Sequence, residues 1–262
     1  MEGKVALVTG GSRGIGFMIA RGLALGGARV YIASRDAARC EAAARELSGA
    51  AGAGACAALP ADLSSEAGVQ ALAAAFAERE PALHLLVHDA ALQRTAPLAE
   101  HSGRDFEEIF ALNVTAAFLL VRELLPRLEA AAAPGDPARV VHVGSADGIR
   151  VPALESYAYG ASKAALHHLT RHLARRLARR RITVNAIAPG SFATDMLAPV
   201  LERYGESQVV DATPLARLGA PEDVAGGVLF LASRAGAFVT GAILPVDGGL
   251  SLPTSRARGG RA

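Results

Sequence analysis

The stretch TGGSRGIG, from Thr9 to Gly16, decides the fold expected for this chain. It follows the apolar run KVALV and leads into a helical stretch from Ile15 to Leu25, which predicts a strand, a tight turn and a helix. Small residues let such a turn approach a pyrophosphate, whose charge is met by the helix N-terminus. A tight turn that binds nothing is the alternative. The residues expected at this phosphate site are Gly10, Ser12, Arg13, Gly14, Ile15 and Gly16.

Outward from this stretch, short β-branched runs alternate with Ala/Leu-rich helical stretches. We expect strands at 4–10, 29–34, 56–59, 83–90, 138–145, 182–190 and 241–249, and helices at 15–25, 37–47, 64–79, 103–128, 156–177 and 220–233. Alternation with nearly all-apolar strands predicts an α/β fold: a single-domain, Rossmann-like, doubly wound parallel sheet with helices on both faces. We assign that domain to residues 1–252 and expect 253–262, which are basic and Gly-rich, to be a flexible tail.

One segment, about 194–218, has mixed patterning and follows the strand at 182–190. We expect a lid over a site at the carboxyl edge of the sheet, where ligands bind in such folds. A surface excursion without a function is the alternative.

The composition excludes several classes of protein. A net charge of +2 over 262 residues gives no strong attraction to nucleic acid or to an anionic membrane. Cys40 and Cys56 lie outside any CxxC pattern, so we expect no disulfide framework, no metal site and a cytoplasmic location. We expect no signal peptide at the N-terminus. The most apolar stretch, 108–125, contains Asn113, Arg122 and Glu123, so we expect a buried or subunit-interface helix rather than a membrane span.

The end of the second strand indicates which dinucleotide would bind. A carboxylate here suits the ribose 2′-hydroxyl of NAD, whereas arginine suits a 2′-phosphate. Ser34 takes the place of the acid and Arg35 follows it, so we expect Arg35 and Arg13 to converge on the 2′-phosphate of NADP. Asp36 is either a displaced acid or, as we favour, a helix cap. Asp62 and the adjacent Leu63 lie where an adenine ring is expected, although Asp62 is equally consistent with a helix cap.

The stretch LESYAYGASKAAL, 154–166, contains two of the four tyrosines. Tyr159 lies four residues before Lys163, which places both side chains on one face of a helix. A phenol beside an ammonium can donate a proton near neutral pH. No lysine lies four residues after Tyr157, so we expect that tyrosine to be a packing residue or pocket wall.

Together with the glycine turn, the order Asn113, Ser145, Tyr159 and Lys163 resembles the short-chain dehydrogenase/reductase family. The resemblance extends from VALVTGGSRGIG to PVDGG and includes APG at 188–190 and the following Thr194. It implies that Tyr159 is the general acid/base, that Lys163 lowers its pKa and binds the nicotinamide ribose, and that Ser145 holds the substrate oxygen.

The same resemblance implies that Asn113 holds a water in a proton relay; a buried Asn that satisfies helix backbone is the simpler alternative, and both can hold. Pro189 and Gly190 would lie beside the nicotinamide, with Thr194 near its amide.

One motif departs from the family. Where the family has Asn-Asn-Ala-Gly after the fourth strand, this chain has His88, Asp89, Ala90 and Ala91, of which the last three are expected to contact the cofactor. Asp89 keeps an acceptor but loses the amide donor, and Ala91 adds a methyl group. Tolerated drift is the interpretation that we favour; weakened cofactor binding or lost turnover is the alternative.

Two further stretches, LPADLSSEAG and YAYGASKAALHHLTRHLA, are similar to those of 3-oxoacyl reductases of the rhamnolipid-pathway type. We therefore expect an NADP(H)-dependent carbonyl reductase that acts on a small ketone or acyl thioester, as a homotetramer or homodimer. A sugar or polyol dehydrogenase, or a catalytically weak NADP-binding subunit, are the alternatives. The basic run Arg171–Arg181 is expected to be a solvated helix end; contact with an acidic acyl carrier is the other possibility.

Overall fold

The computed structural model describes residues 1–51, 55–152 and 154–253. The Gly-rich residues 52–54 and the expected tail from 254 onward lie outside the described residues.

Seven parallel strands form one sheet in the order β3-β2-β1-β4-β5-β6-β7. Thr9, the last residue of β1, pairs with Ala33 of β2 on one side and with His88 of β4 on the other. The strand order reverses between β1 and β4, and in open α/β sheets this reversal opens a crevice at the carboxyl ends of the strands. The predicted fold class is therefore confirmed. The strands are β1 Val5–Thr9, β2 Arg29–Ala33, β3 Cys56–Ala58, β4 Leu85–His88, β5 Ala138–Val143, β6 Ile182–Pro189 and β7 Ile243–Val246.

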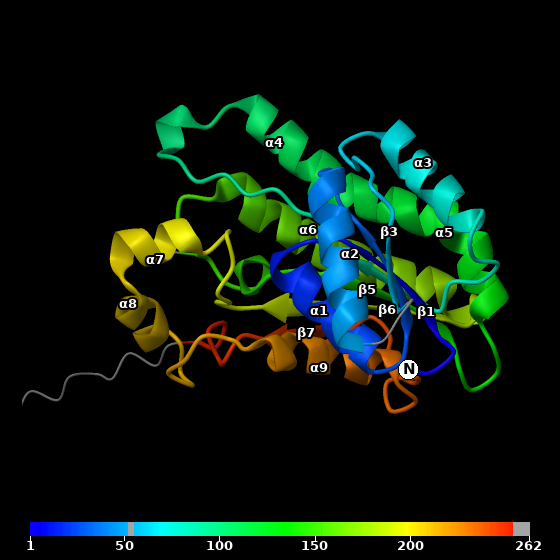
Figure 1. Cartoon of the computed structure of the whole chain (residues 1–262). Helices are drawn as coiled ribbons and strands as arrows, with labels where there is room; N and C mark the ends of the chain where they lie inside the picture. Colours follow the sequence, from blue (N-terminus) through cyan, green and yellow to red (C-terminus); the bar gives the residue numbers. More distant parts are fainter. Residues whose placement is uncertain (52–54, 153, 254–262) are drawn as a thin grey trace, which may run out of the picture.

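Helices cover both faces of the sheet (Figure 1). Helices α1 (Gly14–Leu25), α2 (Ala37–Ala51) and α9 (Pro221–Ala232) share one hydrophobic cluster with the sheet. Helices α3 (Glu66–Ala77), α5 (Ala116–Ala131) and α6 (Tyr157–Leu177) share the other. The N-cap of α3 is Ser65, whose hydroxyl accepts a hydrogen bond from the backbone N–H of Gly68. Short 3₁₀ turns lie at Leu98–Glu100, Ala146–Gly148 and Ala178–Arg180.

The helix expected at 103–128 is helical from Gly103 to Ala131 but is interrupted. Helix α4 (Gly103–Phe110) passes through a π-turn at Ala111–Thr115 into α5. By length and composition alone this helix could cross a membrane, with a mean hydropathy of 1.6. Its fully buried leucines pack in the core beside the sheet, as expected for a core helix: Leu120, Leu124 and Leu128.

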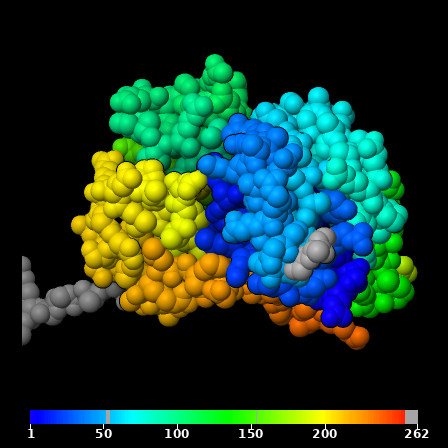
Figure 2. All heavy atoms as spheres, in the orientation of Figure 1, coloured from blue at the N-terminus to red at the C-terminus, as the bar shows by residue number. Residues whose placement is uncertain are grey.

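The segment predicted as a lid forms two short helices, α7 (Ala198–Tyr204) and α8 (Glu206–Asp211), neither of which buries a side chain. It returns to the body at Thr213, which is buried, and at Leu215, whose N–H donates to the carbonyl of Gly248 at 3.0 Å. Figure 2 shows this segment in yellow, where it meets the green residues around α4 and the blue N-terminal part on one face.

Candidate active site

The glycine turn after β1 has the geometry of a phosphate loop. Gly10 and Gly14 adopt positive φ angles of 71° and 55°. A β-carbon at Gly16 would lie 2.5 Å from the carbonyl oxygen of Gly10, so no larger residue fits there without a shift. Arg13 occupies the cap position of α1 without a side-chain cap hydrogen bond, which leaves the helix N-terminus open to an anion. Ser12 and Ile15 lie in the same turn, partly buried.

The two arginines expected at a 2′-phosphate, Arg13 and Arg35, differ in their contacts. The Arg13 guanidinium donates to Asp195 Oδ2 at 3.0 Å, in the first part of the segment predicted as a lid. A guanidinium nitrogen of Arg39 lies 3.9 Å from the same oxygen. Arg35 is exposed, and within the described ranges it forms no ion pair. Sequence reasoning missed both Arg39 and Asp195, because their proximity depends on where the lid folds back.

Two carboxylates near this edge behave as turn residues. Asp36 accepts a hydrogen bond from the backbone N–H of Arg39 at 3.0 Å, so it caps α2 as we favoured; Ser34 donates to its carbonyl at 3.3 Å. Asp62 accepts from the N–H of Ser64 and does not cap α3, where Ser65 is the cap residue. The side chain of Leu63 is buried in the core, so only its backbone could face a cofactor.

At the carboxyl end of β5, the structure brings Ser145, Tyr159 and Lys163 together. All three side chains are buried. Lys163 Nζ donates to the carbonyl of Val143 at 2.8 Å and lies 5.5 Å from the centre of the Tyr159 ring. The Ser145 hydroxyl lies close enough to the Tyr159 phenol to lower its pKa. This is the arrangement that the Tyr-x-x-x-Lys spacing predicted.

The protonation of these groups differs from the sequence-based expectation. Burial raises the pKa of Tyr159, and the nearby Ser145 hydroxyl only partly opposes this. Burial lowers the pKa of Lys163 to about 8, with Asp89 acting in the opposite direction. Lys163 was expected to lower the pKa of Tyr159, but in the cofactor-free site desolvation of the phenolate dominates. Tyr159 therefore stays protonated across neutral pH.

Asn113 lies in the π-turn, fully buried, and contacts the chain after β4. Its Oδ1 accepts from the N–H of Leu92 at 2.8 Å, and its Nδ2 donates to the carbonyl of Leu92 and to Ser162 Oγ, both at 3.0 Å. Ser162 lies on α6, next to Lys163. The amide of Asn113 thus joins the loop after β4 to the helix of Tyr159, and it satisfies loop backbone rather than helix backbone.

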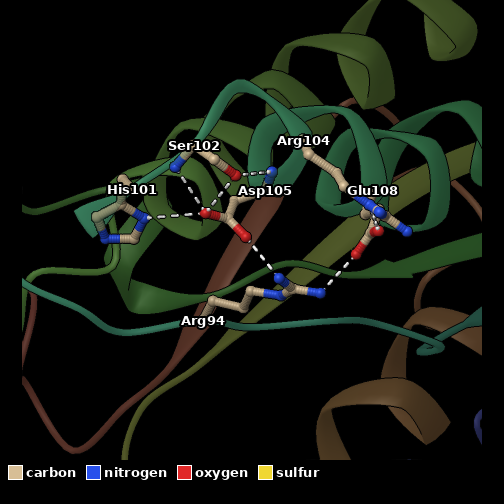
Figure 3. Close-up of polar contacts among 6 residues, drawn as sticks. All are labelled: Arg94, His101, Ser102, Arg104, Asp105 and Glu108. Atoms are coloured by element: carbon tan, nitrogen blue, oxygen red, sulfur yellow. Dashed lines mark hydrogen bonds and ion pairs between the residues drawn. The ribbon is translucent and has the colours of Figure 1, made fainter.

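The loop after β4 is held at both ends. Figure 3 shows Asp105 of α4 accepting from Ser102 and from Arg94, whose guanidinium also reaches Glu108. On the other side, Glu155 accepts hydrogen bonds from the N–H of Leu98 at 2.9 Å and from the Tyr157 hydroxyl at 2.8 Å. Tyr157, 41% exposed, is therefore a loop contact at the border of the site.

The HDAA motif lies directly behind the glycine turn. Thr9 Oγ1 accepts from the N–H groups of Asp89 and Ala90 at 3.2 and 3.3 Å and contacts the His88 ring at 3.2 Å. Ala91 does not adopt a positive φ, so its methyl group causes no backbone strain. Burial lowers the pKa of His88 to about 3, so the ring is neutral at physiological pH.

The chain after β6 closes the far side of the site. A β-carbon at Gly190 would lie 2.8 Å from the α-carbon of Asp247, so only glycine allows this approach beside Pro189. The methyl group of Thr194 lies 3.5 Å from the position of a β-carbon at Gly14, which brings the start of the lid onto the glycine turn. Across the described parts of the chain, no group of three or more metal-ligand side chains occurs, and both cysteines are free.

Comparison with known proteins supports one family. The family model described as enoyl-(acyl carrier protein) reductase matches residues 10–251. The rhamnolipids biosynthesis 3-oxoacyl-[acyl-carrier-protein] reductase of Pseudomonas aeruginosa is 44% identical over 253 residues, which cover 96% of this chain and 98% of that protein. This chain belongs to the short-chain dehydrogenase/reductase family.

Other members of the short-chain dehydrogenase/reductase family extend the comparison. The solved Pseudomonas aeruginosa RhlG/NADP active-site complex has a TM-score of 0.92 at 44% identity, covering 96% of this chain and 98% of that one. Galactitol 2-dehydrogenase (L-tagatose-forming) of Cereibacter sphaeroides is 38% identical over 96% of both chains. The family resemblance predicted from the motifs, including its similarity to the rhamnolipid-pathway reductase, is thus confirmed.

Proposed function

We propose that this protein is an NADP(H)-dependent carbonyl reductase whose substrates are 3-oxoacyl compounds. The observation that supports this most directly is the juxtaposition of Ser145, Tyr159 and Lys163 at the carboxyl end of β5, on the same sheet edge as the glycine turn. A proton donor and a dinucleotide cradle at one edge suit the reduction of a carbonyl group.

The residues present fit a dinucleotide. The glycine turn leaves no room for a β-carbon at Gly16, and the open N-terminus of α1 follows it. Arg13, Arg35 and Arg39 are exposed cations at the end where the second strand stops, which suits a 2′-phosphate. When NADPH is bound it supplies the hydride; the protein supplies orientation and the proton.

Three side chains position the substrate and supply the proton. Ser145 positions the carbonyl oxygen of the substrate. Tyr159 holds a proton at its hydroxyl oxygen, and its raised pKa keeps that proton in place until charge develops on the substrate oxygen. Lys163, fixed on the Val143 carbonyl, binds the cofactor ribose and stabilises the phenolate after proton transfer.

Asn113 would hold a water that returns a proton to this group. Both of its amide protons are already engaged by Leu92 and Ser162, which leaves the second lone pair of Oδ1 for the water.

The substrate class is proposed from similarity and from exposed apolar side chains near the site. The rhamnolipids biosynthesis relative is named a 3-oxoacyl-[acyl-carrier-protein] reductase. Around the loop after β4, the lid and the turn after β5, apolar side chains that could contact an acyl chain stand exposed: Leu98, Ile149, Val151, Met196 and Leu215. A sugar alcohol would gain little from them. The second candidate, a polyol dehydrogenase, is supported by the similarity to galactitol 2-dehydrogenase.

The test is NADPH oxidation with a matched panel: 3-oxoacyl thioesters of increasing chain length, a ketohexose, and the corresponding alcohols with NADP⁺. We expect kcat/KM to rise with acyl chain length and to be lowest for the sugar. A higher kcat/KM for the ketohexose than for every thioester would favour the polyol candidate. NADPH binding without turnover of any compound would favour the catalytically weak subunit.

We further propose that residues 1–252 act as one cytoplasmic catalytic domain with a lid at about 194–218. Two hydrophobic clusters that share one sheet support a single domain. The substrate partner is a small ketone or an acyl thioester, and the protein works as a homotetramer or homodimer.

A further inference from the structure

Asp89 lies in an unusual place for a carboxylate. Its Oδ2 is 2.9 Å from the position of a β-carbon at Gly10 and 2.6 Å from that at Gly16, so it supports the glycine turn from behind. Gly16 belongs to the first turn of α1, so this oxygen lies against the start of that helix. The backbone N–H of Asp89 is fixed on Thr9. Asp89 is partly buried.

The side chain at position 89 lies beside a backbone carbonyl oxygen of the glycine turn, which a hydrogen-bond donor would suit. The carbonyl oxygen of Gly10 and Asp89 Oδ2 both lie against Gly16, 2.5 and 2.6 Å from the same β-carbon position. An asparagine there can accept from Gly16 and still donate an N–H to a neighbouring carbonyl. An ionised carboxylate can only accept, whereas a protonated carboxyl regains one donor. A proton on Asp89 therefore gives it one donor beside its acceptor oxygen, which is one of the two donors that asparagine would supply.

The surrounding charges define when this proton binds. Helix α6 supplies Lys163 and Tyr159 as the ionisable groups that interact with Asp89. The preceding residue on β4, His88, packs edge-on against His142 of β5. Both histidines are neutral, since burial lowers the pKa of each to about 3. Burial raises the pKa of Asp89 to about 7, and Lys163 opposes that shift. The carboxyl group therefore titrates near neutral pH.

We propose that Asp89 is a positioning residue that takes up a proton when the dinucleotide binds, so that cofactor affinity falls as the pH rises through neutrality. The proposal rests on the proposed function, in that NADP(H) occupies the glycine turn. A bound pyrophosphate adds negative charge in front of the turn and excludes water from Asp89. Both effects favour the neutral carboxyl, which restores the missing donor under the loop.

The sign follows from linkage. Below the pKa of Asp89 in the free protein the proton is already present, and affinity does not depend on it. Above that pKa each binding event takes up a proton, and affinity falls by up to tenfold per pH unit. Replacing Asp89 by Asn supplies the donor permanently and removes this dependence.

The experiment is titration of the full-length protein with NADH and NADPH between pH 6 and pH 8, for the wild type, Asp89→Asn and Glu129→Gln. NADH is included because the 2′-phosphate of NADPH itself titrates near pH 6. Glu129 is on α5 and pairs with Arg180, so Glu129→Gln is a remote control with the same change in charge. We expect Kd for NADH to rise about fivefold from pH 7 to pH 8 in the wild type and in Glu129→Gln, and less than twofold in Asp89→Asn.

Calorimetry in two buffers of different ionisation enthalpy measures the proton directly. We expect uptake of nearly one proton per NADH at pH 8 in the wild type and much less in Asp89→Asn. Equal pH slopes in wild type and Asp89→Asn, or binding without proton uptake, would overturn the proposal while leaving the proposed function intact. Absence of binding of either cofactor at every pH would overturn both.

Discussion

Tyr157 and Tyr159 stand two positions apart at the start of α6, yet burial separates their chemistry. Tyr159 is 7% exposed and lies beside Ser145 and Lys163, whereas Tyr157 is 41% exposed and bonds Glu155. The i, i+4 spacing to a lysine distinguished the two correctly, because α6 keeps residues four apart on one face. The direction of the Tyr159 pKa shift could not be predicted in the same way, since it depends on how much protein surrounds the phenol.

Tyr159→Phe should lower kcat by about 10²–10⁴-fold, because it removes the proton donor and leaves the cradle for the cofactor in place. Tyr157→Phe is the matched control on the same helix and should keep kcat close to that of the wild type. NADPH oxidation and NADPH titration together measure the two effects. Turnover by Tyr159→Phe within a few-fold of the wild type would remove the assignment of the general acid.

Arg35→Asp should weaken NADPH binding about tenfold to hundredfold and change NADH binding little, because a charge-assisted hydrogen bond to the 2′-phosphate is lost. Arg45→Asp, further along α2 and paired with Glu41, is the control and should leave the preference unchanged. The measurement is the dissociation constant of NADPH and of NADH for the wild type and both variants. Equal affinity of the wild type for NADH and NADPH would contradict the NADP assignment.

The buried histidines predict acid sensitivity. Burial lowers the pKa of His88 and His142 to about 3 and that of His167 to about 4, below the unfolded value near 6.5. Their stability contribution is complete above pH 6.5 and is lost as the pH falls, because the unfolded chain takes up the protons first. Asp89 acts in the opposite direction, since its folded pKa is raised.

His88→Asn should therefore reduce the pH dependence of the unfolding free energy by about 1.4 kcal/mol per pH unit between pH 6 and pH 4. His168→Asn, at an exposed position of α6, is the control and should keep the slope of the wild type. Denaturant unfolding at a series of pH values gives both slopes. An unchanged slope in His88→Asn would mean that this ring is already protonated in the folded protein.

At the scale of elements, the periodic parts of the chain were predictable and the irregular parts were not. Short apolar runs located each of the seven strands within the described residues, and α3 begins after Ser65, inside the predicted helix at 64–79. The π-turn around Asn113 was missed because its cause is tertiary: the amide of Asn113 binds the backbone of Leu92, across the loop after β4. The pairing of Arg13 with Asp195 was missed for the same reason.

The loop after β4 depends on the contacts drawn in Figure 3. Asp105→Ala should lower the midpoint of thermal unfolding by several degrees and raise KM for the ketone, because it removes the bonds from Ser102 and Arg94 that hold the loop. Arg104→Ala removes only an exposed contact with Glu108 and should leave both values unchanged. Scanning calorimetry and steady-state kinetics provide the readouts. Identical behaviour of the two variants would mean that the loop is held elsewhere.

At the scale of the whole molecule, exposed aromatic side chains favour association of subunits. Phe106 and Phe118 on the α4–α5 helix are 40% and 43% exposed, and Phe230 on α9 is 43% exposed. Isologous pairing would bury these side chains and brace α6, which carries Tyr159.

Sedimentation at micromolar concentration should accordingly show a tetramer or dimer without substantial monomer. Phe118→Glu should shift the distribution toward smaller species and lower the thermal midpoint, because it places a charge in the buried contact. The surface control is Arg45→Gln, at an exposed position of α2. A monodisperse, active monomer of the wild type would contradict the proposed assembly.

The central position of β1 has a consequence for synthesis on the ribosome. The strand made first is flanked by β2 and by β4, so one of its edges has no partner until residues 85–88 have emerged. Translation at roughly 5–20 residues per second leaves that edge, with its unpaired backbone N–H and C=O groups, exposed for seconds. This time is long enough for nascent chains to associate through it. Chaperone capture is most useful in this interval. A bound dinucleotide could stabilise the chain only later, because Lys163 is not yet translated when the glycine turn is made.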